Sequence, residues 1–355
     1  FSLFSIIIRI FKNSLKTLLD GVNDGVNDGV EESKMKHTWK VTLMILALFL
    51  ITQLIGLAVI KTYTVGWEVK KTVTDETGIE REVVQNVTKV LPYGFEPPEI
   101  NPQVSLITII IAIIVATFII LLLGRIHANL IIKLWFAFVV VITMAVAIST
   151  LLPAALALLI SALLTYYKIF RRDLVIHNLT ELLIYPGLAA VFVPILNIGV
   201  TVLLLIFLSF YDFYAVFKSK HMIELAKYQL QELKIFTGFF LPYMRREDYE
   251  KLQKLKKLKK LKGVEGKGKG KEQKFKVNVA ILGGGDVAFP LIFAGVVLKS
   301  FNSFFYGTII AVFSTLALLF LLMTARKGKF YPAMPFITVG TLLGFGLVWL
   351  INALA

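Results

Sequence analysis

The chain has 355 residues, of which 57% are hydrophobic and 17% charged, and its mean hydropathy is +0.77. Because soluble domains are about half apolar and about a quarter charged, this composition excludes a soluble globular protein and predicts a chain that spans a lipid bilayer. The net charge is +15, and the absence of cysteine excludes disulfides, thiol nucleophiles and zinc–thiolate sites.

The first 37 residues are expected to lie outside the bilayer core. Residues 1–18 are apolar with interspersed basic side chains, a pattern typical of an amphipathic helix on the membrane surface. The repeat DGVNDGVNDGV at Asp20–Val30 is rich in turn-forming residues, and it lacks the remaining ligands of a calcium loop. We therefore predict an amphipathic segment and a flexible linker over residues 1–37.

Hydrophobic runs of about the length needed to cross a bilayer recur nine times in the rest of the chain. They lie at Trp39–Val59, Val104–Leu123, Leu130–Leu151, Ala154–Phe170, Leu179–Ile195, Val200–Phe217, Val277–Leu298, Phe304–Met323 and Met334–Ala353. The pattern predicts an all-α polytopic membrane protein with nine transmembrane helices, six within residues 38–217 and three within residues 277–355. We expect a multi-pass protein of the cell membrane.

The positions of Lys and Arg predict the orientation, because basic residues are retained on the cytoplasmic side. With a cytoplasmic N-terminus, the cytoplasmic connections contain basic residues such as Lys34, Arg125, Arg172 and Lys327. The opposite side receives short links and the loop 63–101, which has 7 acidic and 4 basic residues. The C-terminus is then expected to be external.

The external loop is expected to contain a β-hairpin. Val65–Val73 and Ile79–Val90 are rich in strand-favouring residues, and the turn sequence Asp75–Gly78 separates them.

Residues 218–276 form a strongly basic cytoplasmic loop, with 18 basic and 7 acidic residues. Because the block lies between two hydrophobic segments, anionic lipid headgroups and topology signalling explain it better than nucleic acid, which is not expected as a partner. Leu252–Lys262 has the pattern of a cationic amphipathic helix on anionic lipid. A solvated charge run that serves topology alone fits the same pattern.

Two carboxylates lie well inside apolar spans, Asp212 in the sixth and Asp286 in the seventh. A charged group deep in lipid costs at least about 2.5–3.5 kcal/mol, so each needs an explanation. Asp212 lies six residues before Lys218, and Asp286 lies nine residues after Val277. On straight helices these positions are roughly 9 and 14 Å from the cytoplasmic edge, so adjacent antiparallel helices could bring the two side chains together.

A pair of adjacent carboxylates has a defined chemistry. Two such groups a few ångströms apart cannot both ionise, so they share a proton near neutral pH. The ionised member can then take a proton from water while the protonated member polarises a carbonyl group. This chemistry needs neither metal nor cofactor, and none is expected.

The residues around the two aspartates are candidates for shaping the site. Glycines weaken a membrane helix locally and permit close backbone approach, and prolines leave backbone groups free. Helix packing and a helix start would explain the same residues if the aspartates were absent. The candidates are Tyr211, Gly283, Gly284, Gly285, Pro332, Ala333 and Met334.

Together these motifs resemble the presenilin and signal peptide peptidase family of GxGD intramembrane aspartyl proteases, in its archaeal presenilin-like branch. The resemblance rests on Tyr211-Asp212, on Gly283-x-Gly285-Asp286 and on Pro332-Ala333-Met334, on the sixth, seventh and ninth spans, and it covers roughly Leu130 to the end. Met334 stands where the family usually has Leu, and Met is of similar volume and flexible.

The resemblance implies a presenilin-like fold in which Asp212 and Asp286 are catalytic and the Pro332 motif helps to engage substrate. The substrate would be a transmembrane helix, unwound locally and cut within the bilayer. The N-in orientation resembles presenilin, and a homologue of this type is expected to work alone or as a homo-oligomer.

Other functions fit part of the pattern. A cation transporter or channel could use the two intramembrane aspartates, although we find no convincing internal repeat. The prepilin-peptidase class also uses a GxGD motif, but the Pro-Ala motif of the ninth span argues against it. A structural role for two unpaired buried acids is hard to justify energetically.

Overall fold

The computed structural model describes residues 39–74, 80–87, 89–95, 128–171, 173–219, 237–243, 278–325 and 331–354, and single helical positions between 108 and 122. Four predicted features lie wholly or mostly outside these residues. They are the N-terminal segment 1–37, the turn Asp75–Gly78, the span Val104–Leu123 and the basic helix Leu252–Lys262.

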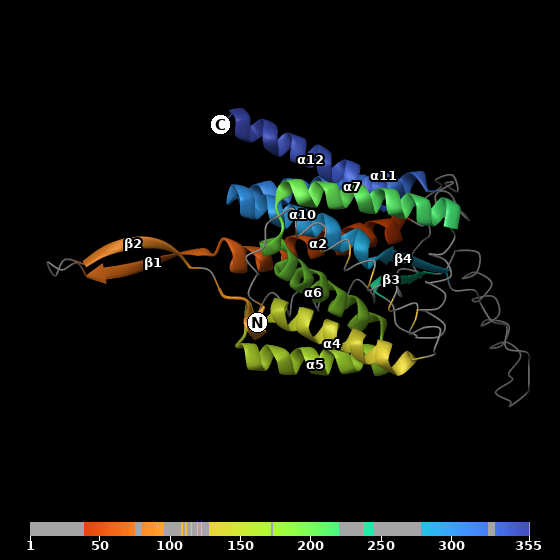
Figure 1. Cartoon of the computed structure of the whole chain (residues 1–355), viewed down its shortest axis with the longest axis horizontal. Helices are drawn as coiled ribbons and strands as arrows, with labels where there is room; N and C mark the ends of the chain where they lie inside the picture. Colours follow the sequence, from red (N-terminus) through yellow and green to blue (C-terminus); the bar gives the residue numbers. More distant parts are fainter. Residues whose placement is uncertain are drawn as a thin grey trace, which may run out of the picture.

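The described part of the chain is mainly helical (Figure 1). Seven of its helices are long and apolar enough to cross a membrane, whereas α5 is apolar but has 17 residues. The helices are α2 (Trp39–Thr64), α4 (Asn129–Ile148), α5 (Ala154–Phe170), α6 (Leu174–Phe192), α7 (Ile198–Tyr214), α10 (Gly284–Phe301), α11 (Phe304–Thr324) and α12 (Met334–Leu354). Short 3-10 segments lie at Pro92–Gly94 and Val193–Ile195, and a π-helical turn at Ala215–Ser219 continues α7.

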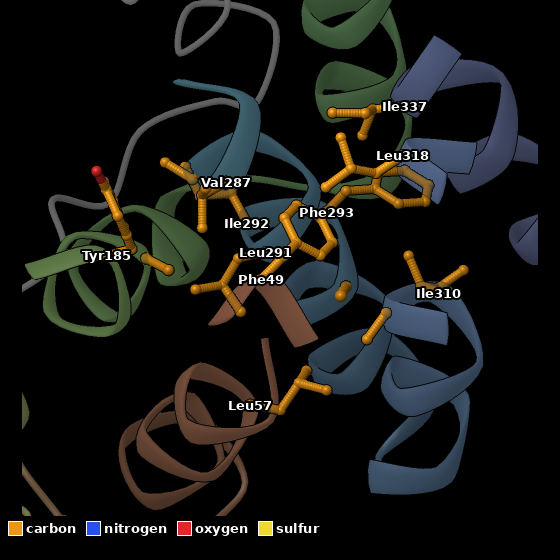
Figure 2. Packing of buried hydrophobic residues seen from close by; sticks show 14 of the residues in the cluster. Phe49, Leu57, Tyr185, Val287, Leu291, Ile292, Phe293, Ile310, Leu318 and Ile337 are labelled. Atoms are coloured by element: carbon orange, nitrogen blue, oxygen red, sulfur yellow. The ribbon is translucent and has the colours of Figure 1, made fainter. Parts of the chain in front are cut away.

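Helix α10 lies at the centre of the bundle and packs against α2, α6, α7, α11 and α12. Figure 2 shows Leu291 and Phe293 of α10 among Phe49 of α2, Ile310 of α11 and Ile337 of α12, all of them fully buried. Helices α4 and α5 lie on one side of this centre and α11 and α12 on the other (Figure 1). The helix that begins with the GGGD sequence is therefore surrounded by protein.

The predicted hairpin is confirmed. β1 (Trp67–Thr74) and β2 (Glu80–Val87) pair antiparallel, with Trp67 opposite Val87 and Thr74 opposite Glu80. The hairpin extends away from one end of the helix bundle (Figure 1). At its base, the amide of Lys89 donates to the carbonyl oxygen of Thr62 at 3.0 Å, which ties the returning strand to the end of α2.

Helix α6 begins five residues before the predicted start at Leu179. Asp173 caps it, because one carboxylate oxygen accepts hydrogen bonds from the amides of Val175 and Ile176 at 2.7 and 3.2 Å. A cap of this kind satisfies amides that have no partner within the helix. The hydropathy pattern did not reveal this start because His177 and Asn178 interrupt the apolar run.

The prediction of a helix over Val277–Leu298 is wrong in its first part. Residues Asn278–Gly283 form a strand, β4, which pairs antiparallel with β3 (Gly238–Tyr243), and α10 begins only at Gly284. The prediction of an all-α chain needs the same correction. β-Branched residues favour a strand in this segment, and the glycines that follow disfavour an early helix start.

Candidate active site

Asp212 lies near the C-terminal end of α7 and is only 6% exposed. Its Oδ2 accepts a hydrogen bond from the backbone amide of Met334, the first residue of α12, at 3.1 Å. The first amides of a helix have no partner within the helix and attract negative charge. One turn before Asp212, Ser209 donates to Thr338 of α12 at 2.7 Å. The start of α12 is therefore held against the aspartate by two polar contacts.

Asp286 lies in the first turn of α10 and is partly exposed. It is the third residue of this helix, so the predicted depth of nine helical residues is wrong. Helix α7 packs against α10, and the carboxyl group of Asp212 lies close enough to act electrostatically on that of Asp286. The side chains that hydropathy singled out thus come from two neighbouring helices, at the same end of the bundle.

The three glycines before Asp286 have different surroundings. Gly283 caps α10, and a Cβ atom placed on it would lie 3.0 Å from Asp286 Oδ2. A Cβ atom on Gly284 would lie 2.8 Å from the hydroxyl oxygen of Tyr185. Gly285 is exposed, and a Cβ atom there would make only an ordinary contact with Phe289. Gly283 and Gly284 are therefore needed for packing inside the protein, whereas Gly285 faces outward.

The other predicted site residues lie at varied distances from the aspartates. Pro332 and Met334 are buried and Ala333 is partly buried in the turn that starts α12, next to Asp212. Tyr211 is 50% exposed, so its ring lies on the outer face of α7. The structure brings the Pro332 motif to Asp212 and leaves the Tyr211 ring at the surface.

Strand β3 is a part of the site region that hydropathy did not predict. Its backbone is fixed to α6 by Asn178, which donates to the carbonyl of Phe240 and accepts from its amide, both at 2.9 Å. His177 Nε2 hydrogen-bonds to the carbonyl oxygen of Gly238 at 2.8 Å. Because β3 pairs with β4, these side chains fix the strand that leads into the GGGD sequence.

A buried ion pair also escaped prediction. Glu181 is fully buried, and its Oε1 lies 2.5 Å from Nζ of Lys168, which is 6% exposed. Lys168 also donates to the hydroxyl of Thr180 at 3.0 Å. In the sequence, the pair is indicated only by the opposite charges of Lys168 and Glu181, which lie on either side of the short link between α5 and α6.

The fold and the site together define a polytopic helical membrane protein with a buried and a partly exposed carboxyl group on neighbouring helices at one end of its bundle. The family model described as signal-peptide peptidase, presenilin aspartyl protease matches residues 91–354. The chain therefore belongs to this family of intramembrane aspartyl proteases.

Comparisons with individual proteins add little. A solved structure of a presenilin family intramembrane aspartate protease, in space group C222, is similar, with 17% sequence identity and a TM-score of 0.49. The alignment covers 86% of this chain and 96% of that chain. No curated protein sequence matches.

Proposed function

We propose that the chain is an intramembrane aspartyl endopeptidase of the GxGD type and that Asp212 and Asp286 are its catalytic pair. The observation that carries the proposal is their placement on adjacent helices, α7 and α10, within electrostatic range. The hydrogen bond from the Met334 amide to Asp212 supports a role for the Pro332-Ala333-Met334 motif in holding that carboxylate.

The pair would act by general acid–base catalysis. The ionised aspartate takes a proton from a water molecule, and this water attacks the scissile carbonyl carbon. The protonated aspartate donates a hydrogen bond to the carbonyl oxygen. Collapse of the tetrahedral intermediate breaks the C–N bond, and the proton that the base took from water passes to the leaving amine. The bond from Met334 favours the ionised form of Asp212, which makes Asp212 the better candidate for the base.

The proposed substrate is a transmembrane helix that unwinds locally before cleavage. An intact helix protects its carbonyl groups through its own hydrogen bonds, so the scissile bond must leave the helix to be attacked. The partial exposure of Asp286 and the outward-facing Gly285 support the approach of an extended substrate backbone at this point. A side chain on Gly285 would occupy that approach.

The topology remains part of the proposal. We propose nine spans with a cytoplasmic N-terminus and an external C-terminus, arranged as segments 1–37, 38–217, 218–276 and 277–355 of a cell-membrane protein. The β1–β2 hairpin and the β3–β4 strands lie at opposite ends of the bundle, which supports placing the loops 63–101 and 218–276 on opposite sides (Figure 1). Anionic lipid at the basic loop and a homo-oligomer are further proposals.

Cleavage of a single-span test substrate by purified protein in detergent tests the proposed function. We expect both Asp212→Asn and Asp286→Asn to abolish product, because each keeps the shape of the side chain and removes its ionisable group. Asp173→Asn is the matched control, since this exposed residue caps α6 and asparagine also caps helices. It should cleave like the wild type.

Two outcomes would contradict the proposal. Equal product from the wild type and both site variants would reveal a contaminating protease. A wild type that neither cleaves nor binds a hydroxyl-containing transition-state analogue, but supports cation flux in vesicles, would favour a cation transporter built on the same two aspartates.

A further inference from the structure

Three polar side chains form a row along one face of α6. His177, Glu181 and Tyr185 are spaced four residues apart, and residues at this spacing lie above one another on a helix. Glu181 and Tyr185 are 0% and 3% exposed. A row of this kind inside a membrane protein is costly, so it calls for a functional explanation.

The centre of the row is charged. Glu181 Oε1 lies 2.5 Å from Lys168 Nζ and 3.8 Å from His177 Nε2. Buried ion pairs add little stability compared with well-packed apolar residues of similar size, because both ions lose their hydration. Stability alone is therefore a weak reason for this pair.

Both ends of the row lead to residues 283–286, the three glycines and Asp286, which we call the glycine turn. At one end, His177 hydrogen-bonds to the carbonyl of Gly238, and Gly238 is the residue that pairs with Gly283 across the β3–β4 ladder. At the other end, the Tyr185 hydroxyl oxygen lies 2.8 Å from the position that a Cβ atom on Gly284 would occupy. Gly284 is thus contacted directly from this face of α6, and Gly283 is reached from the same face through Gly238.

The end of the row at Tyr185 is closely packed yet incompletely bonded. The Tyr185 hydroxyl and Glu181 Oε2 are buried, and neither has a hydrogen-bond partner within ordinary distance among the described residues. Glu181 and Asp286 both lie close enough to act electrostatically on the Tyr185 hydroxyl. The ring is fixed on one side by an edge contact with Phe239 of β3, with centroids 6.0 Å apart, and it belongs to the same buried cluster as Val287 of α10 (Figure 2). The unpaired hydroxyl therefore lies in the field of two carboxyl groups, Glu181 and Asp286.

We propose that Tyr185 and Glu181 are positioning residues for Asp286. Glu181, neutralised by Lys168, orients the Tyr185 hydroxyl against the turn 283–286, and this contact holds the Asp286 carboxyl group at the angle that catalysis requires. The inference rests on the proposed protease function for its kinetic consequence, but the packing of the turn is a property of the fold. Neither residue touches the reacting atoms.

The competing explanation is that the ion pair only joins α5 to α6. Under that explanation the loss of the pair would lower stability, and every catalytic effect would follow from unfolding. Under the positioning role, the glycine turn loosens in a protein that is still folded. The two explanations therefore differ in what happens to residues 278–286 when the fold is intact.

Tyr185→Phe tests the proposal, because it keeps the ring and removes only the hydroxyl. We expect kcat to fall by about tenfold or more, as misplacement of a catalytic group is costly, with KM unchanged because the substrate is not contacted. Hydrogen exchange of the backbone amides in residues 278–286 should quicken by about tenfold. The matched control is Tyr63→Phe, whose hydroxyl bonds to the Val146 carbonyl at 2.8 Å near the hairpin end of α2. It should change neither quantity.

A second variant separates positioning from stability. Glu181→Met alone leaves Lys168 unpaired and is expected to destabilise the protein, whereas Glu181→Met with Lys168→Met should restore stability. If the double variant is stable but has a low kcat and fast exchange at 278–286, the proposal holds. Wild-type kcat and exchange in either the double variant or Tyr185→Phe would overturn it. Should the wild type cleave nothing, the proposed function fails, and the exchange measurements still decide the positioning role.

Discussion

Helix α12 contains two glycines that test how tightly the site helices are packed. A Cβ atom added to Gly340 would overlap with Cβ of Ala317 on α11 and would lie 2.8 Å from the carbonyl oxygen of Phe313. A Cβ atom on Gly346, in the same helix, would meet nothing within 4 Å. Gly340→Ala and Gly346→Ala are therefore the same chemical change with different surroundings.

The expected magnitudes follow from two contributions. Replacing glycine by alanine inside a helix stabilises it by about 1 kcal/mol, and both variants share this gain. Overpacking costs about 1–3 kcal/mol, and we expect the upper end at Gly340 because the Phe313 carbonyl is backbone and cannot rotate away. Gly346→Ala should therefore be more stable than Gly340→Ala by about 3 kcal/mol, roughly a hundredfold in the folding equilibrium.

Reversible unfolding of the two variants in mixed micelles would measure this difference, in which the shared helix contribution cancels. Gly340→Ala should also cleave more slowly, because α12 contains Met334, whose amide holds Asp212. Equal stability of the two variants would show that α11 and α12 separate without cost and would refute the reasoning.

Three further substitutions have defined expectations in the same unfolding assay. Lys299→Met removes a charged donor from three carbonyl oxygens between α6 and α7, at 2.8–3.1 Å, and should cost about 2 kcal/mol; Lys40→Met, at an exposed position, should change little. Ser209→Ala and Thr338→Val break one bond between α7 and α12, and a double-mutant cycle should give a coupling of about 0.6 kcal/mol; additive effects would contradict that bond. Asp173→Ala should cost about 1 kcal/mol through loss of the α6 cap, and no loss would mean that water replaces it.

Hydropathy alone predicted most of the helices in the described part of the chain. The bounds expected for α5 are those observed, and α11 differs from its prediction by one residue at its end. This success has a physical basis, since a segment that crosses lipid must satisfy its backbone internally and be apolar over about 20 residues. Each residue contributes its transfer free energy independently of its distant neighbours, so the sum can be read along the sequence.

The start of α10 was beyond this reasoning. The segment Asn278–Gly283 is apolar enough to extend a membrane helix, and periodicity cannot separate a short buried strand from a helical turn. What decides the matter is a partner strand, β3, about 40 residues earlier, whose own position depends on Asn178. This strand pairing places Asp286 in the first turn of α10, whereas counting helical residues from Val277 had placed it deeper.

The sequence by itself determined that the chain is a membrane protein and that Asp212 and Asp286 are its unusual acids, because the cost of an acid in lipid depends on residue type and depth. Only the tertiary structure decided that the Met334 amide meets Asp212, that Lys168 neutralises Glu181 and that Tyr185 packs on Gly284. These contacts depend on how each helix is rotated about its axis. Rotation is set by packing between side chains that are far apart in the sequence, and hydropathy contains no information about it.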